Sequence, residues 1–198
     1  MSGHYFTPEP GGADVRRQVV VRLAGRDVTV TTSGGVFSPG RVDAGTRVLL
    51  DHVDDPAPGD LLDLGCGWGP LALAAGLRAP GVDVWALDVN SRALDLAATN
   101  ARALGLERVR AVTADQVGAD LRFTTIWSNP PIRIGKPALH KLLATWLGRL
   151  TDDGTAWLVV ARNLGADPLH RWLAETLGRP VDRVASAKGF RVLRVTPR

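Results

Sequence analysis

Three glycines at alternate positions follow a short apolar run that contains an acidic residue. The run is Leu61-Leu62-Asp63-Leu64, and the turn Gly65-Cys66-Gly67-Trp68-Gly69 leads from it into a helical pattern. Glycine adopts positive φ and lets a ligand approach the backbone, so a strand-to-helix turn of this kind is typical of nucleotide sites in open α/β sheets. A carboxylate at Asp63 repels a pyrophosphate but holds an ammonium group, directly or through water. The pattern D-x-G-x-G-x-G therefore favours S-adenosylmethionine, which has an ammonium group and no phosphate.

Further acidic residues follow the next two apolar runs. Asp88 lies 19 residues after Gly69 (88 minus 69), where an acid accepts hydrogen bonds from both hydroxyls of a ribose. Asp115 is placed to accept from the adenine amino group, and Gln116 is a second candidate for that contact. The alternative role of these acids is to cap the helices that follow. The predicted cofactor contacts around these runs are Asp63, Gly65, Cys66, Gly67, Trp68, Gly69, Asp88, Val89, Asn90, Asp115 and Gln116, with Cys66 also interpreted as a small apolar filler.

An Asn-Pro-Pro-Ile turn follows the apolar run Thr124–Trp127. The exocyclic amine of a nucleobase is a poor nucleophile because its lone pair is delocalised, so a methylating site must accept both N–H protons and orient the nitrogen. The side-chain oxygen of Asn129 and the carbonyl of Pro130 supply two such acceptors, and the paired prolines stiffen the turn. The predicted catalytic residues are Asn129, Pro130, Pro131 and Ile132, with Asn129 also contacting the cofactor. The alternative is an ordinary structural turn.

Two cations flank Gly135 directly after this turn. Arg133 and Lys136 are predicted to contact phosphates of a nucleic-acid substrate, where backbone charges position the reacting base. The alternative is that both belong to a solvated helix start.

The elements that carry these residues alternate between strand and helix. The runs LLDLG, VDVWALD, RVRAVTA, TTIWSN and TAWLVVA predict strands, and helices are predicted over Gly69–Ala79, Ser91–Leu104, Pro137–Leu150 and Asp167–Leu177. This alternation indicates a mostly parallel sheet covered on both faces, that is, a Rossmann-like, doubly wound α/β fold. The runs VDRVASA and FRVLRVT flank Lys188-Gly189 and predict a closing antiparallel hairpin.

The region before this core has a different pattern. Residues Val15–Thr32 predict a short β-hairpin with its turn at Ala24-Gly25-Arg26. The Gly- and Pro-rich stretch Ser33–Gly40 predicts a loop that leads into a helix near Thr46–Val53. We expect residues 1–198 to form one domain, with the hairpin and a cofactor-covering loop in residues 1–45 and the Rossmann-like core in residues 46–198.

Composition narrows the possible classes of protein. The 198 residues contain no apolar stretch long enough for a membrane span and no secretory signal, which predicts a cytoplasmic protein. One cysteine and four histidines give no pattern for a disulfide or a metal site, so no metal is expected. The net charge is +4, and from Ala161 onward eight Arg or Lys face three Asp or Glu. This excess favours a polyanionic partner, although it also serves solubility.

The chain resembles the small-domain class I methyltransferases, the group that contains the C-type guanine-N2-methyltransferases of small-subunit rRNA and their single-domain archaeal relatives. The resemblance implies a seven-stranded sheet with an antiparallel last strand, S-adenosylmethionine as methyl donor, and the N2 amine of a guanine in rRNA as acceptor. It also implies that the loop around Phe37 and Ser38 folds over the cofactor and that residues 40–46 help line the site. The matching segments are His4-Tyr5-Phe6, Gly35–Ser38, Gly40–Asp43 with Gly45-Thr46, Asp63–Gly69, Asn129–Lys136 and Gly189–Leu193.

The sequence departs from the larger members of that group and leaves other acceptors open. The chain has no room for the duplicated N-terminal domain of the larger bacterial enzymes, and its NPPI turn continues as Arg-Ile-Gly-Lys, as in the single-domain relatives. A protein glutamine or a small-molecule amine poses the same orientation problem to the Asn-Pro-Pro turn. A binding module with a decayed site is a further alternative, and a nicotinamide oxidoreductase is disfavoured because G-x-G-x-x-G is missing. The oligomeric state is not predicted.

Overall fold

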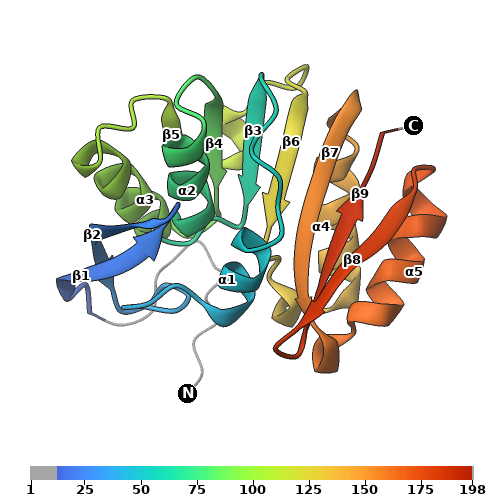
Figure 1. Cartoon of the computed structure of the whole chain (residues 1–198), viewed down its shortest axis with the longest axis horizontal. Helices are drawn as coiled ribbons and strands as arrows, with labels where there is room; N and C mark the ends of the chain where they lie inside the picture. The colour runs from blue at the N-terminus through green and yellow to red at the C-terminus, as the bar shows by residue number, and fades with distance from the viewer. Residues whose placement is uncertain (1–12, 198) are drawn as a thin grey trace.

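Seven strands form one sheet in the order β5-β4-β3-β6-β7-β9-β8 in the computed structural model, which describes residues 13–197 (Figure 1). Two further strands form a separate hairpin. The strands are β1 (Arg16–Leu23), β2 (Arg26–Ser33), β3 (Asp60–Leu64), β4 (Asp83–Leu87), β5 (Val109–Val112), β6 (Phe123–Ser128), β7 (Leu150–Ala161), β8 (Val181–Ala187) and β9 (Phe190–Val195). The helices are α1 (Ala44–Leu50), α2 (Pro70–Arg78), α3 (Ser91–Ala103), α4 (Lys136–Leu147) and α5 (Ala166–Leu177), with the 3-10 turns η1 (Ala114–Gln116), η2 (Ile132–Ile134) and η3 (Arg162–Leu164).

The strand directions confirm the predicted fold class. Strands β3 to β7 pair in parallel, whereas the last strand, β9, is antiparallel to both of its neighbours, β7 and β8. The predicted end of α4 is wrong: α4 ends at Leu147, not Leu150, and Leu150 begins β7. Gly148 follows the helix, and the apolar Leu150 fits the spacing of a helix and of a strand equally well.

The alternation of side chains along the strands places apolar residues on both faces of the sheet. Leu61 points into a buried cluster with α1, α2, α3 and the β1–β2 hairpin, whereas Leu62 points into a second cluster with α4 and α5. Figure 1 shows α1 and α2 in front of the sheet and α4 behind it. The sheet is therefore covered on both faces, as a mostly parallel sheet requires.

Two tight turns close the predicted hairpins. Ala24 and Gly25 both have positive φ (48° and 78°) between β1 and β2, and Lys188 and Gly189 repeat this pattern (49° and 82°) between β8 and β9. Positive φ at both central residues is the signature of a type I′ turn, whose twist matches that of antiparallel strands. Both predicted hairpins are thus confirmed.

The β1–β2 hairpin is fixed to α3 by one buried side chain. The Asn100 Oδ1 accepts a hydrogen bond from the Thr31 N–H at 2.7 Å, and its Nδ2 donates to the Thr31 carbonyl at 3.0 Å and the Trp68 carbonyl at 3.1 Å. A single amide therefore joins the hairpin, the glycine turn and α3.

Helix α1 begins two residues earlier than predicted because Asp43 caps it. The Asp43 Oδ2 accepts hydrogen bonds from the Gly45 N–H at 2.7 Å and the Thr46 N–H at 3.4 Å. The expected division between residues 45 and 46 therefore falls inside this helix. None of the described helices is long and apolar enough to cross a membrane.

Candidate active site

A cavity of about 510 Å³ opens beside the carboxyl ends of β3, β6 and β7. The chain leaves β3 toward β4 on one side, and β6 pairs with β3 on the other, so this is the point where the strand order reverses. Open α/β sheets bind their ligands at this point. The lining residues are Val36, Phe37, Asp43, Gly65, Gly67, Asp88, Ala93, Asn129, Pro130, Pro131, Ile132, Arg133, Ile134, Val159, Ala161, Leu164 and Phe190.

The glycines of the turn have different structural roles. Gly65, Gly67 and Gly69 all have positive φ (80°, 56° and 96°), which explains the alternate spacing. A Cβ on Gly67 would meet no atom within 4 Å, whereas one on Gly69 would lie 3.2 Å from the Ala97 Cβ. Gly67 therefore keeps the turn open toward the cavity, and Gly69 lets α2 pack closely against α3.

Asp88 holds the glycine turn in shape from the end of β4. Its Oδ2 accepts from the Gly67 N–H and its Oδ1 from the Asn90 N–H, each at 2.9 Å. Asp88 is buried and lines the cavity. Burial raises the pKa of this carboxyl, against the lowering effect of the backbone N–H groups. Lone pairs remain on both oxygens for donors within the cavity.

Asp63 is fully buried below the turn and has one unpaired oxygen. Its Oδ2 accepts from the Ala72 N–H at 2.9 Å, while its buried Oδ1 has no hydrogen-bond partner among the described residues. Desolvation raises the pKa of Asp63 to about 8, and the nearby charge of Asp88 adds to this effect. Asp63 lines a pocket of about 20 Å³ next to the main cavity. An unpaired buried carboxylate oxygen suits a positively charged ligand group.

Asn129 faces Asp43 and Thr46 with the nitrogen end of its amide. Its Nδ2 donates to the Asp43 Oδ2 and to the Thr46 Oγ1, each at 3.1 Å. An ionised carboxylate only accepts hydrogen bonds, so the amide nitrogen and not the oxygen must face Asp43. No described residue donates to the Asn129 Oδ1, and Asn129 lines both cavities. The site thus contains a hydrogen-bond acceptor held in a fixed orientation.

The two prolines after Asn129 form a tight turn at the cavity wall. The Pro130 carbonyl accepts from the Ile132 N–H at 2.8 Å, and Pro131 has φ −75° and ψ 75°, the angles of an inverse γ-turn. A carbonyl oxygen has two lone pairs, so the Pro130 oxygen keeps one acceptor position. Two acceptors from adjacent residues therefore belong to the same wall.

A profile of the family described as "Methyltransferase small domain" matches residues 27–194. The chain belongs to the methyltransferase small-domain family. It is a class I methyltransferase with S-adenosylmethionine as its cofactor, as the glycine turn and the spaced acids predicted.

Three similar proteins illustrate this membership. Uncharacterized protein YbxB of Bacillus subtilis is 33% identical over 98% of this chain and 98% of its own length. Ribosomal RNA small subunit methyltransferase C of Pseudomonas syringae pv. tomato is 40% identical over 77% of this chain but only 47% of its own. The structure of the T. thermophilus 16S rRNA N2 G1207 methyltransferase (RsmC), in complex with AdoMet and guanosine, has a TM-score of 0.80 at 25% identity over 94% of this chain and 52% of its own. This chain therefore spans about half the length of the rRNA methyltransferases that it matches.

The residues present fit the cofactor of a small-domain methyltransferase. The unpaired Asp63 oxygen suits its ammonium group, and the open backbone of Gly67 leaves room for its flat rings and ribose next to Asp88. Phe37 lines the main cavity and is 47% exposed, and Ser38 lines the smaller pocket with its Oγ donating to the Arg41 carbonyl. The Phe37 loop therefore borders both cavities.

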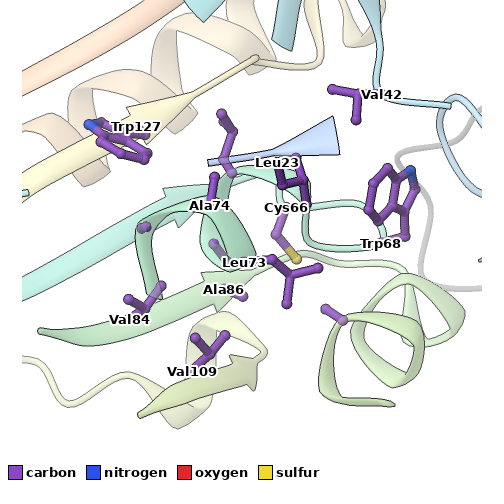
Figure 2. Packing of buried hydrophobic residues seen from close by; sticks show 14 of the residues in the cluster. Leu23, Val42, Cys66, Trp68, Leu73, Ala74, Val84, Ala86, Val109 and Trp127 are labelled. Carbon is purple, nitrogen blue, oxygen red and sulfur yellow. The ribbon is translucent and has the colours of Figure 1, made fainter. Parts of the chain in front are cut away.

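Several residues predicted to contact the cofactor of this small-domain methyltransferase are buried, form a helix cap or line neither cavity. Cys66 and Trp68 line the smaller pocket but are almost completely buried among apolar side chains (Figure 2). Burial raises the pKa of the Cys66 thiol, which agrees with its interpretation as an apolar filler. The Asn90 side chain caps α3 and donates to the Gly35 carbonyl. Val89 lines neither cavity.

The contacts predicted after β5 lie outside the two cavities. Asp115 and Gln116 are exposed in η1, and the Gln116 Oε1 accepts from the Thr113 N–H at 2.9 Å. A hydrogen bond from the Thr113 side chain lowers the pKa of Asp115. Of the predicted phosphate contacts, Arg133 lines the main cavity, whereas Lys136 is exposed at the start of α4 and lines neither.

Sequence reasoning alone gave no role to several side chains at the cavity, and Asp43, Thr46 and Phe190 are the most informative of them. Asp43 and Thr46 contact Asn129, and Phe190, from β9, lines the wall. The resemblance implicated residues 40–46 only as a segment. The local signal for Asp43 was the D-x-G-T order of an N-cap, which predicts a helix start but no partner across the fold. No described group of three His, Cys, Asp or Glu could hold a metal ion.

Proposed function

We propose that this methyltransferase transfers a methyl group to the exocyclic N2 amine of a guanine in ribosomal RNA. The observation that carries the proposal is the fixed amide of Asn129, whose oxygen is available beside the Pro130 carbonyl at the wall of the main cavity. Two adjacent acceptors fit the two N–H bonds of a primary aromatic amine. The names of the rRNA methyltransferase relatives, and the guanosine in the T. thermophilus structure, support guanine in rRNA as the acceptor.

The cofactor-binding residues in this proposal are those around the glycine turn. Asp88 accepts from the ribose hydroxyls, and Asp63 faces the ammonium group. A pocket of about 20 Å³ has room for about one water molecule, so we favour a water-mediated contact to Asp63 over a direct one. When bound, S-adenosylmethionine supplies an electrophilic methyl group on its sulfonium. We propose that Phe37, which lines the cavity from the loop between β2 and α1, folds over the bound cofactor.

The catalytic contribution of the chain is to orient and stabilise the amine. The Asn129 Oδ1 and the Pro130 carbonyl accept the two N–H bonds and so fix the nitrogen with its lone pair toward the methyl group. As the N–C bond forms and the C–S bond breaks, positive charge develops on the nitrogen, and both acceptors then bind more strongly. One proton leaves the now acidic nitrogen for solvent, so no strong base is required. Pro131 and Ile132 keep this wall rigid.

The substrate is held by charge outside the cavity. Arg133 is exposed at the rim, and Lys136 follows three residues later, where both are placed to contact RNA phosphates. We further propose that the chain acts as one catalytic domain on rRNA in the cytoplasm.

The test is methyl transfer to defined acceptors. Purified protein and deuterium-labelled S-adenosylmethionine are incubated with 16S rRNA and, separately, with assembled small subunits from cells that lack the gene. The RNA is then digested to nucleosides and analysed by mass spectrometry. We expect labelled N2-methylguanosine. Transfer of the label to a protein glutamine or to a small-molecule amine, and not to RNA, would show that guanine is not the acceptor. If no RNA is labelled, calorimetry with S-adenosylmethionine shows whether the preparation still binds the cofactor.

A further inference from the structure

We propose that Asp43 and Thr46 are positioning residues, which fix the Asn129 amide and strengthen its oxygen as the acceptor for the substrate amine. The inference rests on the proposed function, because it assigns the Asn129 Oδ1 to that amine. In this arrangement the Asp43 carboxylate binds the nitrogen end of the Asn129 amide, a contact that no local pattern of the sequence had suggested.

The contact joins parts of the chain that are far apart in sequence. Asn129 follows β6, whereas Asp43 and Thr46 lie 86 and 83 residues earlier, at the start of α1. The Asn129 Nδ2 donates a hydrogen bond to each of these two residues at 3.1 Å. The two N–H bonds of the amide therefore have separate partners, and rotation of the side chain breaks both.

The carboxylate is itself held in place. The Asp43 oxygen that faces Asn129 also accepts from the Gly45 and Thr46 N–H groups, so the first turn of α1 fixes its direction. A Cβ on Gly45 would lie 3.0 Å from this oxygen and 2.9 Å from the Phe190 ring, which explains why glycine suits this position. Thr46 is only 3% exposed, so its hydroxyl is shielded from competing water.

A negative charge at the nitrogen end of an amide does more than hold it. It polarises the amide toward its oxygen, and hydrogen bonds in a chain strengthen one another. The Asn129 Oδ1 becomes a stronger acceptor at the stage when the substrate nitrogen gains positive charge. Asp43 therefore stabilises the reacting state through Asn129 without touching the substrate amine.

The variants must separate this role from helix capping, because Asp43 caps α1. Asp43→Ser keeps a good cap with a side chain too short to reach Asn129, and Asp43→Asn keeps the oxygen but removes the charge. Thr46→Val removes the second acceptor at nearly constant volume. Thr32→Val is the matched control, because Thr32 is also buried and its hydroxyl has no hydrogen-bond partner among the described residues.

Steady-state kinetics gives the first readout. We expect kcat to fall about tenfold in Asp43→Asn, at least as much in Asp43→Ser, and severalfold in Thr46→Val, since a charge-assisted hydrogen bond is roughly twice as strong as a neutral one. We expect the KM for S-adenosylmethionine to stay within about twofold, because the proposal assigns the cofactor's ammonium group and ribose to Asp63 and Asp88 and not to these residues. Thr32→Val keeps the wild-type kcat. An unchanged kcat in Asp43→Asn and Asp43→Ser would overturn the proposal.

A double-mutant cycle tests whether Asp43 acts through Asn129. In the Asn129→Ala background, Asp43→Asn should lower kcat no further, because the residue that transmits its effect is gone. Independent, multiplicative losses would overturn the proposal even if both single variants were slow. The cycle can be run on whichever amine the enzyme methylates, so it does not depend on guanine being the acceptor.

The last readout needs no methyl acceptor. The Asn129 Nδ2 resonances are assigned in ¹H–¹⁵N spectra by their loss in Asn129→Ala. We expect the proton bound to Asp43 to shift and to exchange faster in Asp43→Ser, the proton bound to Thr46 to do so in Thr46→Val, and neither to change in Thr32→Val. Resonances that do not move in Asp43→Ser and Thr46→Val would show that the amide is not held by these residues.

Discussion

Asn129 has two hydrogen-bonding ends with different partners. Its nitrogen is bound to Asp43 and Thr46, which leaves its oxygen for the substrate. The Asn129→Ala variant should therefore lose an interaction that matters mainly while the amine reacts. We expect turnover to fall about 100-fold or more with little change in S-adenosylmethionine affinity. Single-turnover methylation and calorimetry measure the two effects, and normal turnover would contradict the catalytic role.

The buried carboxyl of Asp63 makes the stability of the fold depend on pH. Its pKa in the folded protein is raised to about 8, well above the unfolded value, so folding favours the protonated form. The contribution of this residue to stability is complete below about pH 4 and is lost as the pH rises toward 8, by at most about 1.4 kcal/mol per pH unit.

The isosteric variant Asp63→Asn has no charge to bury and should lose less stability over this pH window. Urea unfolding of the cofactor-free protein at pH 5 and pH 8 measures the difference, with Asp120→Asn, at an exposed position, as the control. Equal losses in the wild type and in Asp63→Asn would mean that Asp63 is not the group that titrates.

At the scale of elements, Asn100 connects α3 with the β1–β2 hairpin and the glycine turn, and the periodicity of the sequence does not predict this connection. Its three hydrogen bonds satisfy both backbone groups of Thr31 and the Trp68 carbonyl. Asn100→Ala leaves these groups without partners, which should cost about 2 kcal/mol or more of unfolding free energy. Hydrogen exchange should also show lost protection at the Thr31 N–H. The control Asn163→Ala, exposed in η3, should change the unfolding free energy by less than about 0.5 kcal/mol.

The element boundaries show where local patterns were sufficient. The glycine turn, the β1–β2 and β8–β9 hairpins and the strand–helix alternation were predicted from short-range spacing, because each depends on backbone angles within a few residues. The end of α4 was not, since Leu150 suits either a helix or a strand. The start of α1 differs from the prediction because Asp43 caps the helix two residues earlier.

At the scale of the molecule, four of the eight basic residues after Ala161 are bound to partners within the fold. Ion pairs join Arg183 and Arg191 to Asp167 and Arg194 to Asp182. The buried Arg179 donates to the Thr151 carbonyl at 2.8 Å. The number of basic residues in this segment is therefore weaker evidence for a polyanionic partner than the sequence suggested.

In the proposed function, RNA binding at the cavity rim depends on individual exposed cations. Arg133→Ala should weaken RNA binding and reduce the slope of log affinity against log salt concentration by about 1, the change expected for one lost phosphate contact. Arg122→Ala is the matched control, because Arg122 precedes β6 at the opposite edge of the sheet. Filter binding or anisotropy across a salt series measures both, and equal slopes for Arg133→Ala and the wild type would exclude Arg133 from the interface.

Local spacing was sufficient to predict the fold class, the strand-end positions of Asp63 and Asp88, and the Asn129 turn, because parallel strands end at one edge of the sheet. Tertiary structure alone decided which of these side chains remain available. It paired Asn129 with Asp43 across 86 residues, buried Trp68 and Cys66, and engaged Gln116 in a cap. Hydrogen-bond partners and burial depend on contacts between distant segments, and local periodicity contains no information about those contacts.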